Sequence, residues 1–95
     1  MIETRETFCR FCHAACPLHV DVEINSTGAR TQEVVIAVRG IMEDPLFEGY
    51  TCIKGRQLAD QHHAPDRLRN PLQRNDDGSF TEVTSKDALD DIANR

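Results

Sequence analysis

Tryptophan is absent from this sequence, and aromatic residues make up only 5% of its 95 residues. Hydrophobic residues as a whole reach 39%, so the chain has little apolar surface to bury. Domains of this size are marginally stable unless a metal, a disulfide or a partner holds them together. We therefore expect a single small domain, residues 1–95, that depends on such an additional staple.

The chain also lacks an excess of positive charge and any long apolar run. Its 11 Lys and Arg residues are outnumbered by 16 Asp and Glu residues, which gives a net charge of −5. This balance argues against nucleic acid as a partner, because proteins that bind it carry basic patches. No apolar run approaches the roughly 18 residues of a membrane span.

The N-terminus, residues 1–7, is acidic and polar, unlike a signal peptide or a transit peptide. We expect it to be a short lead-in without regular structure. A cytoplasmic location is the simplest expectation. A periplasmic location stays open, because an export signal can be removed or carried by a partner.

Cysteine is scarce too, but its four copies form one pattern. Cys9, Cys12 and Cys16 make a C-x2-C-x3-C run, and Cys52 follows far downstream in a C-x-K-G segment. Short spacers let successive thiolates point inward from one tight loop, and the distant fourth thiolate would close a long loop. Iron–sulfur clusters are held by four thiolates in this way. The pattern predicts a [4Fe-4S] cluster on these four cysteines.

Three other interpretations compete with the cluster. A structural zinc site also takes four cysteines, but usually from two C-x2-4-C knuckles, and Cys52 has no cysteine near it. Residues 9–13 spell C-x-x-C-H, the attachment motif of c-type haem, which would leave Cys16 and Cys52 without a role. Four cysteines also allow three disulfide pairings. Cys9 and Cys12 are so close in sequence, however, that a disulfide between them would constrain little of the chain. The cluster alone explains all four cysteines.

The surrounding residues resemble a known family. The run C-x2-C-x3-C-P, followed at a distance by C-x-K-G-R, is similar to the N-terminal [4Fe-4S] domain of molybdenum or tungsten bis-molybdopterin guanine dinucleotide oxidoreductases. Formate dehydrogenases and the periplasmic and assimilatory nitrate reductases belong to that family. Residues 64–72 resemble its "peR-l-P-l" segment, and residues 80–93 resemble the segment that leads into the first pterin-binding domain. The chain departs from the family near Ser85, where a tryptophan is common.

The resemblance implies a role as an electron relay. The cluster would pass single electrons between a molybdenum or tungsten site, held by two pterins, and a redox partner protein. The chain would then be the N-terminal fragment of a longer enzyme, with the remaining domains or subunits as its partners, and no catalysis is expected from it alone. The resemblance places Lys54 between the cluster and the nearer pterin, on the electron path, and implies cofactor-binding roles for Lys54 and Arg56.

The expected fold is a small α+β iron–sulfur domain, with two antiparallel β-hairpins and two short helices around the cysteine loop. Period-two alternation of apolar residues predicts the first hairpin, with a long loop between its strands, and an Asn-Asp-Asp-Gly turn predicts the second. Helical spacing and caps predict the helices. The expected strands are residues 18–24, 33–41, 72–74 and 79–83, and the expected helices are residues 52–63 and 85–94.

Overall fold

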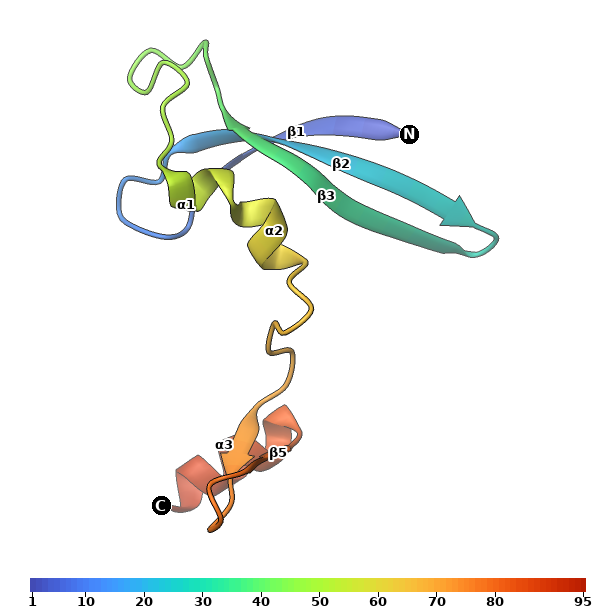
Figure 1. Cartoon of the computed structure of the whole chain (residues 1–95), viewed down its shortest axis with the longest axis vertical. Helices are drawn as coiled ribbons and strands as arrows, with labels where there is room; N and C mark the ends of the chain where they lie inside the picture. Colours follow the sequence, from blue (N-terminus) through green and yellow to red (C-terminus); the bar gives the residue numbers. More distant parts are fainter. The chain divides into compact units, whose positions relative to one another are not determined.

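The computed structural model describes residues 1–95 throughout, and the chain divides into two units, Met1–Pro65 and Asp66–Arg95. The first unit is built on an antiparallel sheet with the strand order β1-β2-β3 (Figure 1). The central strand β2 covers Pro17–Thr27, and β3 covers Arg30–Gly40. The predicted first hairpin is confirmed, and so is the small α+β class.

The connection between β2 and β3 is shorter than expected. Thr27 pairs directly with Arg30, so Gly28 and Ala29 alone make the turn, and the expectation of a long loop was wrong. Gly28 has a φ of 61°, a left-handed conformation that glycine adopts at little cost. The polar residues 25–27 and 30–32, which the alternation pattern had left out, extend the two strands by backbone pairing.

Strand β1, Ile2–Phe8, was not expected. It pairs with β2 along its whole length, from Ile2 opposite Glu23 to Phe8 opposite Pro17. Its side chains are almost all exposed, so it has no buried apolar face and the sequence pattern gave no strand signal. Its place depends on backbone hydrogen bonds to β2, and the amide of Ile24 also donates to the carbonyl of Met1 at 2.7 Å.

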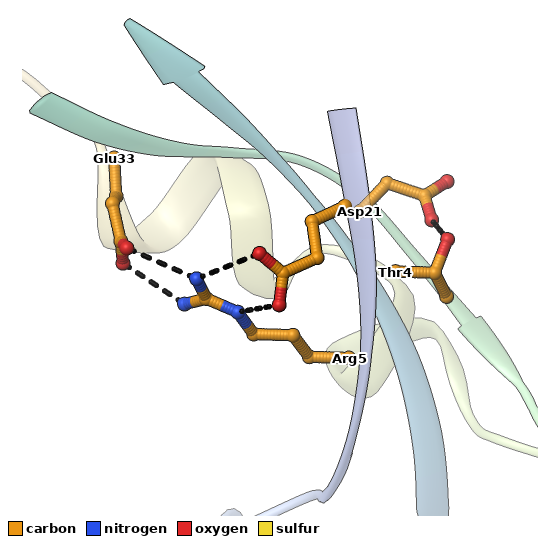
Figure 2. A network of polar contacts seen from close by, with 5 residues as sticks. Thr4, Arg5, Asp21 and Glu33 are labelled. Atoms are coloured by element: carbon orange, nitrogen blue, oxygen red, sulfur yellow. Dashed lines mark hydrogen bonds and ion pairs between the residues drawn. The ribbon is translucent and has the colours of Figure 1, made fainter. Parts of the chain in front are cut away.

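Arg5 joins the two outer strands of this sheet. Its guanidinium donates to both carboxylate oxygens of Glu33 on β3, at 2.9 and 3.0 Å, and also to Glu3 (Figure 2). The Glu33 and Glu3 contacts raise the pKa of Arg5, and Arg5 in turn lowers the pKa of both carboxyl groups. Arg5 pairs with Val20, and residues directly opposite in antiparallel strands share a face. The ion pairs therefore lie on the sheet face that carries Val20.

Two short helices follow the loop after β3. Helix α1 covers Ile53–Arg56 and α2 covers Leu58–His62, where the spacing had predicted one helix over residues 52–63. Gln57, with a φ of −93° and a ψ of 10°, separates them. Leu58 packs against the core, whereas Ile53 is 67% exposed.

The C-terminal end of α2 docks on the outer edge of the sheet. The Nε2 atom of His63 accepts a hydrogen bond from the amide of Val35 on β3 at 3.0 Å. Strand β3 is an edge strand. The backbone amides on its open side have no partner strand, so each needs another acceptor or water. His63 therefore supplies the acceptor that a further strand would otherwise give. Its ring meets that of His62 edge to face.

The second unit holds the other predicted elements. Strands β4, Leu72–Arg74, and β5, Phe80–Glu82, form the expected hairpin, and α3 covers Ser85–Asn94 as predicted. Thr84 caps α3 by accepting a hydrogen bond from the amide of Asp87. No residue of α3 is buried, and its apolar side chains are about two-thirds exposed: Leu89 at 66% and Ile92 at 68%. None of the helices in the chain has the length and apolar character needed to cross a membrane.

Candidate metal centre

The cysteine triplet occupies the loop that joins β1 to β2. The last pair of the ladder is Phe8 with Pro17, and residues 9–16 form the loop beyond it. The amide of Cys9 donates to the carbonyl of Cys16 at 2.8 Å, which holds the two ends of the loop together. Ala15 adopts a φ of 48°, a left-handed conformation that is uncommon for a residue with a side chain. Cys9, Cys12 and Cys16 thus come from one closed loop, as their spacing predicted.

The four cysteines differ in exposure. Cys9 and Cys16 are 5% and 6% exposed and belong to the small core, beside the fully buried Leu18. Cys52 is half-buried, and Cys12 is exposed. All four are free thiols. Two of the ligand candidates are therefore also core residues of the first unit.

Cys52 is delivered by the irregular segment between β3 and α1. Gly49 has a φ of 82°, as expected for a glycine placed there to allow an unusual backbone angle. A side chain at Gly40 would lie only 2.0 Å from the carbonyl oxygen of Gly49, so the two ends of this segment are in direct backbone contact. Cys52 then occupies the N-cap position of α1.

The two cysteine segments meet at Gly55. A β-carbon built on Gly55 would lie 3.6 Å from the Sγ atom of Cys9 and 2.3 Å from the Oγ1 atom of Thr51. Gly55 is buried, and a side chain there would clash with the Thr51 hydroxyl, whereas its distance to Cys9 is that of an ordinary contact. In Figure 1 the loop between β1 and β2 lies beside α1. The Cys9 loop and the segment after Cys52, more than forty positions apart in the sequence, thus lie close together.

The backbone around Cys52 favours its thiolate form. The sulfur makes no cap hydrogen bond of regular geometry, but the amides of Gly55 and then Lys54 lie close enough to lower the pKa of Cys52. The positive charge of Lys54 adds to this effect, and partial burial opposes it. A metal ligand must be deprotonated, and the lowered pKa of Cys52 favours that form.

The donors present, four free thiols, are of the type that an iron–sulfur cluster takes. No group of three His, Cys, Asp or Glu side chains converges closely enough to hold one metal ion. In a four-iron cluster each thiolate binds a different iron, so the sulfurs surround the cluster from several sides. Free thiols on two segments that meet at Gly55 match this requirement.

The other predicted site residues lie on the outer side of α1. Lys54 and Arg56 are both exposed. Lys54 lines an open groove of about 490 Å³, together with Phe11 of the cysteine loop, Ile53, Gln57 and Gln61. Lys54 is therefore placed between the Cys52 segment and an open surface, whereas Arg56 is not among the residues that line this groove.

Thr51 is a site residue that the sequence did not indicate. It is 5% exposed, and its hydroxyl is the one buried side-chain polar atom without a hydrogen-bond partner. The sequence shows a threonine before Cys52 but gives no sign that its hydroxyl would be buried. Burial depends on the approach of Gly55 and the cysteine loop, which only the folded chain reveals.

Comparison with known proteins agrees with this geometry. Residues 2–64 match the family model described as the molybdopterin oxidoreductase Fe4S4 domain. Over 82 residues the chain is 33% identical to a protein of Bacillus subtilis (strain 168) named "Probable oxidoreductase YyaE". That alignment covers 86% of this chain but only 12% of the relative. The four thiols, the closed loop and the family match agree, and the chain belongs to the molybdopterin oxidoreductase Fe4S4 domain family.

Proposed function

We propose that this chain is the electron relay of a molybdopterin-dependent oxidoreductase. When bound, a [4Fe-4S] cluster takes up and gives back one electron at a time. The chain's own part is to hold the cluster with Cys9, Cys12, Cys16 and Cys52 and to set its surroundings. The relay would connect a molybdenum or tungsten site, carried by bis-molybdopterin guanine dinucleotide in other domains or subunits, with a redox partner protein. An enzyme of the formate dehydrogenase or nitrate reductase type, in a reducing cytosol, is the setting that we favour.

One observation supports the proposal most: the contact of Cys9 with Gly55. It brings a thiol of the N-terminal loop to within 3.6 Å of a side-chain position three residues after Cys52. A cluster that bridges these two segments would be enclosed on its inner side by the buried Cys9 and Cys16 and left accessible on the side of Cys12. Such an arrangement suits electron exchange with a neighbouring group, because one side of the site stays near the surface.

Lys54 is the proposed link towards the pterin. It is exposed and lies two residues after Cys52, at the groove shared with Phe11. A lysine stem of four carbons ends in a compact ammonium with three donors, which can reach from the backbone at the cluster to a cofactor in another domain. Arg56, also exposed on α1, would contact the same cofactor through its planar guanidinium.

The replacement of Cys52 by serine tests the ligand set. Cys52→Ser should abolish a stable four-iron cluster, because only that thiolate ties α1 to the cysteine loop. Iron and sulfide contents and the optical spectrum measure the loss. Lys54→Met, two residues away, is the matched control and should bind the cluster normally. A Cys52→Ser variant with four irons and an unchanged spectrum would show that the assignment is wrong.

The optical spectrum of the wild-type protein separates the competing metal centres. A [4Fe-4S] protein is brown, with a broad absorption that bleaches on addition of dithionite. A zinc-stapled structural module would be colourless, and a c-type haem protein would show a sharp Soret band. Either of the last two outcomes would refute the electron-relay proposal.

A further inference from the structure

The hydroxyl group of Thr51 is buried without a partner. The residue is 5% exposed, and no donor or acceptor lies within hydrogen-bonding geometry of its Oγ1 atom. Burying a hydroxyl without a hydrogen bond is unfavourable, because the group loses its bonds to water and gains none. Most such groups in folded proteins find a partner. An unpartnered hydroxyl therefore points to a group that the chain itself does not supply.

The position of this hydroxyl indicates which group that is. Thr51 directly precedes the ligand Cys52, and its Oγ1 atom faces Gly55, 2.3 Å from where a β-carbon would stand. The same point lies 3.6 Å from the Sγ atom of the ligand Cys9. The hydroxyl thus lies near the Sγ atom of Cys9, on the residue before Cys52, in a buried place where water is excluded.

We infer that the Thr51 hydroxyl donates a hydrogen bond to a sulfide of the bound cluster, a sulfur that the chain itself does not supply. This inference rests on the proposed function, since it needs the cluster in place. A hydroxyl has one proton to donate, and reduction adds negative charge to the sulfurs. The hydrogen bond is therefore stronger in the reduced cluster and raises its reduction potential. Hydrogen bonds to the sulfurs are among the factors that set the potentials of such clusters.

On this argument, Thr51 tunes the reduction potential of the cluster and is not a ligand. Its buried place makes the effect large for a single hydroxyl, because a hydrogen bond is electrostatically stronger where water is excluded. The competing explanation is a hydroxyl that bonds a nearby backbone carbonyl after a small rotation, as threonine hydroxyls often do. That role would be structural and would leave the potential unchanged.

Two substitutions in the cluster-loaded protein distinguish these roles. Thr51→Val keeps the branched shape and removes the donor, whereas Thr51→Ser keeps the donor and removes a methyl group. A redox titration followed by EPR of the reduced cluster gives the midpoint potential of each. We expect the potential of Thr51→Val to shift to a lower value at an unchanged iron content, and that of Thr51→Ser to stay near the wild type.

A spectroscopic measurement supplies a second readout. ENDOR of the reduced wild-type cluster, in H2O and in D2O, should show an exchangeable proton coupled to the cluster that is missing in Thr51→Val and present in Thr51→Ser. An unchanged potential together with an unchanged proton signal in Thr51→Val would overturn the inference. If Thr51→Val does not load, Thr51→Ala takes its place, and the same two outcomes decide.

The failure of this inference is distinct from failure of the proposed function. A wild-type protein that loads four irons and loses them in Cys52→Ser supports the ligand set whatever Thr51 does. An unshifted reduction potential in Thr51→Val would then refute only the proposed hydrogen bond from Thr51. A wild-type protein that binds no cluster would overturn both.

Discussion

Lys54 is the side chain on which the proposed electron path depends most. It belongs neither to the core nor to the ligand set, and it stands exposed at the groove beside Phe11. Its neighbour Gly55 is buried against Cys9 and Thr51. The chain therefore passes from the interior of the site to its surface within one residue, and this is the geometry that a connection between the cluster and another domain requires.

Replacing Lys54 by methionine should separate electron transfer from assembly. Lys54→Met, in the assembled enzyme, should retain the cluster, the pterin cofactor and the fold, because the side chain is exposed and methionine keeps an unbranched stem. Reduction of the cluster by substrate should become slower, as measured by rapid mixing. Lys86→Met, which removes a lysine from the second unit, should leave this rate unchanged. An unchanged rate in Lys54→Met, with chemistry shown not to limit, would take Lys54 off the path.

A hydrogen bond to His63 and the packing of Leu58 join α2 to the sheet. Both helices are too short to be stable alone, since isolated helices below about 12 residues are marginal in water. Packing of Leu58 on the core and the bond from Val35 to His63 hold α2 in place. The break at Gln57 precedes both contacts, so α2 makes them separately from α1.

Removing the imidazole of His63 should weaken this junction. His63→Ala leaves the amide of Val35 without its acceptor, and a typical hydrogen bond contributes about 0.5–1.5 kcal/mol. Hydrogen exchange at the Val35 amide should therefore accelerate by up to roughly tenfold, as measured by NMR. His62→Ala is the matched control, because His62 makes only a ring contact with His63. An equal rate of hydrogen exchange at the Val35 amide in both variants would show that His63 does not protect this edge amide.

The molecule as a whole has very little core besides its metal centre. Its buried apolar residues are Cys9, Cys16, Leu18 and Val22, so half of them are proposed cluster ligands. Metal binding and folding are coupled when a site does not form in the unfolded chain. The cluster should thus replace the apolar interior that a chain with so few aromatic residues does not have.

Removing the cluster should loosen the first unit around its ligands. We expect the amides of Cys9 and Arg56, which donate to the carbonyls of Cys16 and Cys52, to lose protection from exchange in the cluster-free protein. Residues 9–16 and the segment around Cys52 should become the most mobile parts. Hydrogen exchange with and without the cluster measures the change, and the far end of the β2–β3 hairpin is the internal reference. Equal protection of the ligand segments in both states would refute the role of the cluster as a staple.

The sequence by itself determined the cysteine pattern, the class of fold and most of the regular elements. The β2–β3 strands, the second hairpin and α3 follow from alternation, turn residues and caps, which are local signals. The spacing of Cys9, Cys12 and Cys16 likewise predicted one tight loop, because short spacers restrict where successive side chains can point.

Only the tertiary structure decided the rest. Strand β1 has no apolar face of its own, so its pairing with β2 arises from the free backbone of that strand and from Arg5, which reaches Glu33 across the sheet. The break at Gln57 was not visible in the helical spacing of residues 52–63. The burial of Thr51 needs two distant segments to meet at Gly55. Contacts between residues far apart in the chain produce no periodic pattern in the sequence, because they depend on the position of the whole backbone.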